Sequence, residues 1–153
     1  GADALGGDFG GLSAMSVREA HDDRTRTGPA NEGIDDVLAR VNHECEWDCV
    51  VRGFDGYRLR LWSGSCPEYA SPLAEFVGVS YMECAFEFSY PVFRLANASE
   101  CSRIGGLVPL DADDIVFAID AETMARMEPM TFYVVANGLM PADVPELAAK
   151  PPA

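Results

Sequence analysis

Lysine is almost absent from this chain, and so are long apolar runs. Ten of the eleven basic residues are arginine, and 25 acidic residues outnumber them, so the net charge is −14. Nucleic-acid binding relies on lysine and arginine to displace counterions from phosphates, and this charge argues against it. No apolar run approaches the length of about 20 residues that a membrane-spanning helix needs, and the sequence does not begin with a charged segment followed by an apolar one. We therefore expect neither a nucleic-acid partner nor a membrane partner.

Catalytic patterns are also missing. The sequence holds no glycine-rich phosphate loop, no nucleophile elbow and no histidine pair spaced for zinc on a helix. Its paired carboxylates are adjacent in sequence, at loops or helix starts, whereas an acid–base pair needs two carboxyl groups in opposed environments. These pairs are Asp22-Asp23, Asp35-Asp36 and Asp113-Asp114. The sequence leaves enzymatic activity undecided but favours a protein without a catalytic role, and it indicates no cofactor.

Cysteine is too scarce and too irregularly spaced for a disulfide framework. The chain has five cysteines, an odd number, so we expect reduced thiols in a cytoplasmic protein. A zinc site is the alternative, because His43, Cys45 and Cys49 lie close together in sequence and Cys66 could supply a fourth ligand. Typical zinc sites contain two cysteines separated by two residues, and this pairing is absent. We therefore predict structural thiols and no metal.

The residues that are present suit one folded domain. Hydrophobic residues make up 48% of the 153 residues and charged residues 24%, as in ordinary globular proteins. Residues 34–45 have helical periodicity, because an apolar stripe recurs at Ile34, Val37, Leu38 and Val41. Other segments alternate with period two and give about seven strands, without repeated strand–helix alternation. We predict a β-rich α+β fold, an antiparallel, partly closed barrel or sandwich with one packed helix.

Composition divides the chain into three parts. Residues 1–33 are rich in glycine and charge and lack apolar periodicity, so we expect a flexible N-terminal extension. Residues 34–147 form the single β-rich domain, and residues 148–153 form a frayed tail. Within the domain we expect residues 98–109 to be irregular. We expect one or two helical turns over residues 121–127, because alanine, glutamate, methionine and arginine favour helix.

The longest aromatic-rich run spans residues 75–97. Period-two alternation places Cys84, Phe86, Phe88 and Tyr90 on one face of a strand. Gly78 indicates a bulge or a close backbone approach, and Pro91 a bend or an edge position. Such a run normally belongs to a hydrophobic core. The alternative is a ligand pocket between sheets, lined by Tyr81, Phe86, Phe88 and Tyr90.

Residues 47–63 predict a β-hairpin whose apolar faces coincide only if its loop has an odd number of residues. A three-residue loop, Phe54-Asp55-Gly56, satisfies this requirement, with Gly56 in the left-handed conformation. The predicted register then places Val51 opposite Leu59, and Cys49 opposite Leu61. The other face carries Asp48 and Val50 together with a cluster of Arg52, Arg58, Arg60 and Trp62. This cluster could bind a carboxylate or phosphate, or its arginines could pair with Asp48 and other local acids.

These features favour a protein that acts through protein–protein contact, as a homo-oligomer or as an immunity-type protein that binds a partner. The acidic field would steer it towards a basic partner. The alternative function is a small-molecule-binding protein or enzyme that uses the aromatic pocket.

Overall fold

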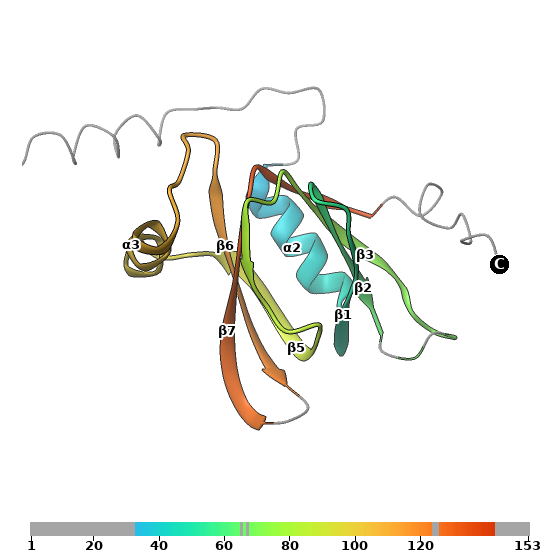
Figure 1. The fold of residues 1–153 in the computed structure, drawn as a ribbon. Helices are drawn as coiled ribbons and strands as arrows, with labels where there is room; N and C mark the ends of the chain where they lie inside the picture. The colour runs from blue at the N-terminus through green and yellow to red at the C-terminus, as the bar shows by residue number, and fades with distance from the viewer. Residues whose placement is uncertain (1–32, 65, 67, 124–125, 143–153) are drawn as a thin grey trace, which may run out of the picture. The chain divides into compact units, whose positions relative to one another are not determined.

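The computed structural model describes residues 33–64, 66, 68–123 and 126–142. The predicted tail and all of the predicted extension except Gly33 lie outside this part of the chain. The described residues form two helices and eight strands, all antiparallel, in one sheet of order β4-β7-β6-β5-β1-β2-β3-β8 (Figure 1). The elements are α2 (Ile34–Glu44), β1 (Asp48–Phe54), β2 (Arg58–Ser63), β3 (Ser71–Val77), β4 (Tyr81–Glu83), β5 (Glu87–Leu95), α3 (Ala98–Leu107), β6 (Ile115–Thr123), β7 (Arg126–Ala136) and β8 (Gly138–Pro141). The predicted β-rich fold class is confirmed.

Helix α2 forms where its apolar stripe predicts it. Gly33 is the N-cap, Asp35 and Asp36 occupy the first turn, and Val37 and Val41 are buried. Carboxylates there interact favourably with the positive end of the helix dipole. The buried stripe packs against the inner face of the sheet, in a core that also contains Leu59, Phe76, Phe88, Phe117 and Val134.

Asn42 of α2 also completes the edge of β5. Its side-chain nitrogen donates to the Phe93 carbonyl at 2.8 Å, and its side-chain oxygen accepts from the Phe93 amide at 2.7 Å. Strand β1 pairs only with Glu87–Ser89 of β5. Asn42 therefore replaces a neighbouring strand where the backbone of β5 would otherwise lack a partner.

The hairpin β1–β2 is present, but its predicted register is wrong. Val51 lies opposite Leu61 rather than Leu59, and Cys49 lies opposite Ser63 rather than Leu61. The register shifts by one residue between Val51 and Gly53. The prediction used a loop with an odd number of residues to bring the apolar sides of the two strands onto the same face. In the structure the extra residue of the bulge has this effect, so the apolar sides of β1 and β2 still share one face. Gly56 has the predicted positive φ, at 91°.

A second bulge changes the face of the aromatic run. Phe88 and Phe93 differ by an odd number of residues, so strict alternation would place them on opposite faces. Both are nevertheless buried, at 0% and 2% exposure. The β5–β6 register shifts between Ser89 and Val92, and Tyr90 has a φ of 50°. The predicted shared face of Phe86, Phe88 and Tyr90 is therefore wrong, because the bulge turns Tyr90 outward and Phe86 lies before the strand.

The two edges of the sheet meet at a corner formed by Gly78 and Asn137. Strand β4 continues from β3 but pairs with β7, and β8 continues from β7 but pairs with β3. The Asn137 amide donates to the Val77 carbonyl and the Ser80 amide to the Val135 carbonyl, both at 2.9 Å. The two pairings differ by only one residue in register. The sheet is therefore a barrel that is partly closed at this corner.

Gly78 makes the corner possible. Its φ is 69°, and a Cβ at this position would overlap the side chain of Asn137. Only glycine adopts such a conformation without strain and also leaves room for the neighbouring side chain. The close approach predicted at Gly78 is present, but it is made by the Asn137 side chain, and Gly78 lies just beyond the end of β3.

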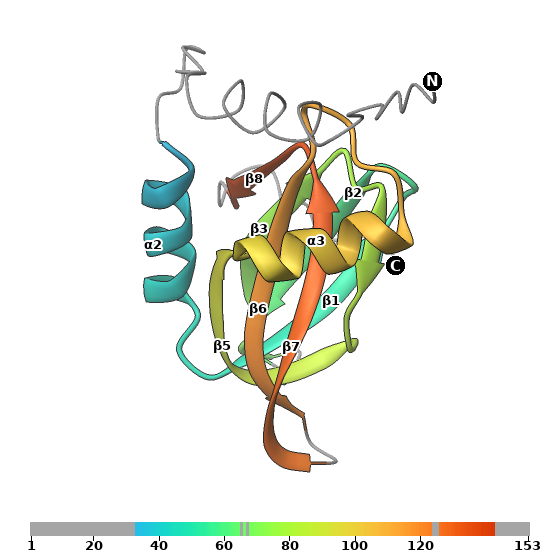
Figure 2. The ribbon, with the colours of Figure 1, turned by 90° about the vertical axis from the view of Figure 1, so that its left-hand side faces the viewer.

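Helix α3 covers part of the outer face of the barrel, across β6 and β7 (Figure 2). Ile104 is fully buried there against Val116, Ala118, Tyr133 and Val135. The prediction that residues 98–109 are irregular is wrong. The helix begins at a capping box, in which the Asn97 side chain accepts from the Glu100 amide at 2.9 Å and Glu100 accepts from the Asn97 amide at 2.7 Å.

The helical turns predicted over residues 121–127 are also wrong. Strand β6 continues to Thr123, and Ala121 pairs with Met130 of β7. Ala121 is buried in the inner core. Pairing and burial override the local helix preference of this segment, as tertiary contacts commonly do.

Candidate interaction surface

The predicted arginine cluster is brought together on the outer face of β1 and β2. We define the arginine face as Arg52, Arg58, Arg60 and Trp62, together with Glu75 of β3. On β2, Arg58, Arg60 and Trp62 occupy alternate positions and therefore share one side of the strand. Leu59 and Leu61 alternate with them and are buried, at 0% and 1% exposure. Burial of these leucines in the core fixes the arginines outside.

Arg52 lies over the ring of Trp62. Its guanidinium carbon is 5.5 Å from the ring centroid, a cation–π arrangement. Arg52 has no carboxylate partner among the described residues, and it is exposed. Val50 and Pro72, both half-buried, lie opposite Trp62 on the two neighbouring strands. The arginine face thus combines a cation, Arg52, with an apolar surface formed by Val50, Trp62 and Pro72, which we call the floor of the face.

Arg58 and Arg60 share the carboxylate of Glu75. Arg58 bonds to it at 3.1 Å, and Arg60 lies 4.0 Å from it and 4.0 Å from Asp55. The Asp55 carboxylate is occupied by the turn, where it accepts from the amides of Tyr57 and Arg58 at 2.9 and 2.7 Å. These amides lower the pKa of Asp55. Glu75 is therefore the one carboxylate within the face as defined. Asp48 of β1 and Glu87 of β5, which lies opposite Val50, border the face on the same side of the sheet.

Neither described helix covers the arginine face. Helix α2 packs on the inner face of the sheet, and α3 packs on the outer face of β6 and β7. Met140 of β8, opposite Glu75, is 54% exposed at the border of the face. Within the described residues, this part of the sheet is therefore covered by neither helix.

Exposed aromatic side chains lie at both ends of this part of the barrel. Phe54 and Tyr57 lie at the tip of the hairpin. Phe86 is near β1, because its carbonyl accepts from the Val51 amide at 2.7 Å. At the other end, the Tyr90 amide donates to the Trp47 carbonyl at 2.6 Å, so these two exposed residues are neighbours. A non-glycine residue with positive φ, such as Tyr90, is often found at functional sites.

The four residues predicted to line a pocket do not come together. Phe88 is fully buried in the inner core and packs against Phe132, with ring centroids 5.6 Å apart. Tyr81 packs at the outer core and donates to Glu83 at 2.9 Å. Phe86 and Tyr90 are exposed, at 78% and 59%. The packing divides the four residues among three environments.

The residues considered for zinc are also dispersed. Cys45 and Cys49 are buried at the end of α2 and in β1, whereas His43 and Cys66 are exposed. Among the described residues, no three potential ligands form a group that could hold a metal ion. The interaction between the two thiols is the main cause that raises the pKa of Cys49 and lowers that of Cys45. Both thiols are at most 6% exposed, so a substrate cannot reach them.

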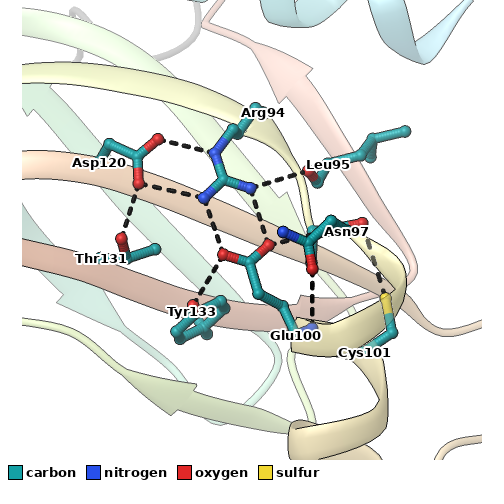
Figure 3. A network of polar contacts seen from close by, with 9 residues as sticks. Arg94, Leu95, Asn97, Glu100, Cys101, Asp120, Thr131 and Tyr133 are labelled. Atoms are coloured by element: carbon teal, nitrogen blue, oxygen red, sulfur yellow. Dashed lines mark hydrogen bonds and ion pairs between the residues drawn. The ribbon is translucent and has the colours of Figure 1, made fainter.

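A polar network joins β5, β6, β7 and α3 on the outer face of the barrel (Figure 3). Arg94 forms two bonds to Asp120, at 2.7 and 3.1 Å, and two to Glu100, both at 2.8 Å. Thr131 donates to Asp120 at 2.7 Å and Tyr133 to Glu100 at 2.9 Å. Paired bonds from one guanidinium to two carboxylates hold the side chains in a fixed orientation.

The electrostatics of this network suit a structural role. The bonds to Arg94 lower the pKa of Glu100 to about 2 and also lower the pKa of Asp120. The same bonds raise the pKa of Arg94. All three groups are therefore held in their charged forms, whereas a general acid or base needs a pKa near the working pH. The arrangement clamps α3 to the barrel.

A second ion pair lies beside this clamp. Arg103 of α3 pairs with Glu83 of β4, and its guanidinium carbon lies 4.7 Å from the ring centroid of Tyr133. The pairing lowers the pKa of Glu83, mainly through its bond with Arg103. Helix α3 therefore bonds to the strands on both sides of the outer core.

Sequence reasoning missed the network because its members lie far apart in the chain. Only Asn97 and Glu100 carried a local signal, the three-residue spacing of a capping box.

Comparison of the chain with family models, with curated proteins and with solved structures gave no match. Neither described helix has the length and apolar character needed to cross a membrane. The geometry of the arginine face is therefore the basis for the function proposed next.

Proposed function

We propose that this chain is a non-catalytic protein that acts through protein–protein contact, with the arginine face and the hairpin tip as its contact surface. The observation that supports the proposal is the exposure of arginine and aromatic side chains on a part of the sheet that neither described helix covers. Tryptophan, tyrosine and arginine are the residues that contribute most to binding at protein interfaces.

Aromatic exposure is unusually extensive for a domain with a complete core. Six aromatic side chains among the described residues are more than half exposed: Trp47, Phe54, Tyr57, Tyr69, Phe86 and Tyr90. Each aromatic side chain can bury about 150–250 Å² in an interface. Phe54 and Tyr57 lie together at the hairpin tip, and this pair is the part of the exposed aromatic surface that the proposal uses.

The ionisable groups support a non-catalytic role. The carboxylates with shifted pKa values are Asp55, Glu83, Glu100 and Asp120, and all four are shifted downward. Burial raises the pKa of the Cys84 thiol to about 12, which keeps it protonated at neutral pH. A catalytic base or nucleophile would need the opposite direction of shift in each case.

No disulfide joins the five cysteines, all of which lie in the described part of the chain, and this supports a cytoplasmic location as part of the same proposal, because thiols remain reduced there. The ligand-pocket alternative gains no support from the packing, since Phe88 belongs to the core and Phe86 to the surface.

Site-specific photo-crosslinking in the source cells tests the proposal. A benzophenone amino acid replaces Tyr57 at the hairpin tip, and in a control chain it replaces Leu107, which is 58% exposed at the end of α3. We expect a discrete crosslinked protein from the Tyr57 position and none from the Leu107 position. Irradiation of the purified chain identifies the product as a second copy or as another protein.

Absence of crosslinked protein at Tyr57, and also at Trp62 and Phe54 in two further variants, would refute contact through this surface. Equal crosslinking from Tyr57 and Leu107 would show that the contact is not confined to the arginine face.

A further inference from the structure

We propose that the arginine face binds an extended acidic segment of a partner protein, with carboxylates at alternate positions followed by an apolar side chain. This inference rests on the proposed function and specifies an acidic partner segment, in place of the basic partner that the net charge alone favoured. It follows from the charge, the spacing and the floor of the face.

The face itself contains three arginines and one carboxylate, Glu75, and the carboxylates of Asp48, Asp55 and Glu87 lie at its border. Glu75 serves both Arg58 and Arg60, and its side chain is only 12% exposed. Arg58 and Arg60 remain 47% and 44% exposed. Guanidinium groups that are exposed and incompletely paired can donate hydrogen bonds to further carboxylates in a bidentate geometry.

The spacing of the face matches an extended peptide. Arg58, Arg60 and Trp62 occupy alternate positions along β2, so they recur about every 6.8 Å. Alternate side chains of an extended partner recur with the same period. A segment that runs along β2 can therefore place two carboxylates on the two arginines and its next alternate side chain on Trp62.

The floor beside Trp62 selects an apolar side chain at the third position. Val50 and Pro72 lie on either side of Trp62, and Arg52 lies over its ring. An apolar side chain that displaces water from this floor adds affinity that a purely charged ligand cannot gain.

The net charge of the chain disfavours polyanions on the same face. At −14 it repels a long anionic polymer such as a nucleic acid. At physiological ionic strength, charges beyond roughly 8 Å are largely screened. A short acidic segment that contacts only the arginine face therefore experiences mainly the arginines.

Fluorescence anisotropy with the full chain tests this inference. The probe is a short fluorescein-labelled peptide that alternates glutamate with serine and carries leucine at the last alternate position. Its matched control has glutamine in place of each glutamate. We expect the glutamate peptide to bind about tenfold more tightly than the glutamine peptide, because two charge-assisted pairs are gained.

Two matched variants locate the binding. Arg60→Gln removes one charge from the face, and Arg40→Gln removes one charge from α2, where Arg40 pairs with Glu44 at 3.0 Å. We expect Arg60→Gln to weaken the glutamate peptide roughly fivefold and Arg40→Gln to change it less than about twofold. Circular dichroism of both variants confirms that the fold is retained.

Equal binding of the two peptides, or equal losses in the two variants, would overturn the inference. Displacement of the peptide by a single-stranded oligonucleotide at equal concentration would overturn it too, since the site would then prefer a polyanion. If crosslinks form at Tyr57 while the glutamate peptide shows no preference, the contact function stands and only the acidic partner is wrong. If the peptide binds as expected but no crosslinks form, the contact function fails and the acidic specificity stands.

Discussion

Replacement of Arg94 by methionine tests whether the polar network is a structural clamp. Methionine retains an unbranched apolar stem, so the change removes mainly the guanidinium and its bonds to Asp120 and Glu100. Hydrogen bonds to charged groups contribute about 1.5–3 kcal/mol each when they are buried. Here the Arg94 and Asp120 side chains are 34% and 38% exposed, although Glu100 is only 15% exposed. We discount for this solvent access and expect a loss of about 2–3 kcal/mol in the free energy of unfolding.

Urea unfolding followed by tryptophan fluorescence measures this loss at pH 7. For a domain of this size, 1 kcal/mol corresponds to roughly 3–4 °C in Tm, so we expect Arg94→Met to melt about 6–12 °C below the wild type. The control is Arg40→Met, which breaks an exposed pair within α2 and should cost about 0.3–0.5 kcal/mol. If Arg94→Met and Arg40→Met lose the same stability, the network is not a clamp.

The pH dependence of the same pair of proteins gives an independent check. The pKa of Glu100 is lowered from 4.5 to about 2 by its bond with Arg94. Its contribution to stability is therefore complete above the unfolded pKa and is lost as the pH falls through the folded pKa. The stability difference between wild type and Arg94→Met should be constant from pH 6 to 8 and should shrink between about pH 4.5 and pH 2. A difference that grew on acidification would contradict this assignment.

Three further comparisons test the packing, two of them with a control substitution. Phe88→Ala should cost about 3–5 kcal/mol of unfolding free energy because the side chain is fully buried, whereas Phe86→Ala, at an exposed position, should change it by less than about 0.5 kcal/mol. Gly78→Ala should cost about 2 kcal/mol or more, from the positive φ and the overlap with a neighbouring asparagine, while Gly138→Ala, with open space around its Cβ, should be tolerated. Asn42→Ala leaves the Phe93 backbone unpaired and should cost about 1–3 kcal/mol. Chemical denaturation measures all three, and equal values within either matched pair would refute the packing assigned to it.

The sequence predicts elements whose signal is local and regular. Helix α2 and the β1–β2 hairpin follow from apolar stripes at their own period, and the outward placement of Arg58 and Arg60 follows from the hairpin pattern alone. These predictions succeed because a buried face fixes which side of a strand or helix points inward.

The errors arise in two situations. In the first, one extra residue in a strand reverses which side chains point inward; in the second, pairing with a strand distant in sequence determines the secondary structure of a segment. Gly53 and Pro91 adjoin the two bulges, and the irregularity at Pro91 agrees with the bend predicted there. Neither residue shows in advance that the alternation after it reverses. Pairing with β7 extends β6 over a segment whose composition favours helix. The Arg94 network depends on strands that only the folded chain brings together, so no sequence spacing could reveal it.

The corner at Gly78 and Asn137 determines when the chain can fold as it is synthesised. The pairings that close the barrel join residues at least 50 positions apart in the sequence, because β3 pairs with β8 and β4 pairs with β7. Closing so long a loop is costly in entropy, and folds with such distant pairings form slowly. Until the last strand leaves the ribosome, β3 has an unpaired edge and the inner core lacks Leu139. A chain that ended before Gly138 would expose an edge open to association with other chains, so this protein completes its fold only after nearly the whole domain has been made.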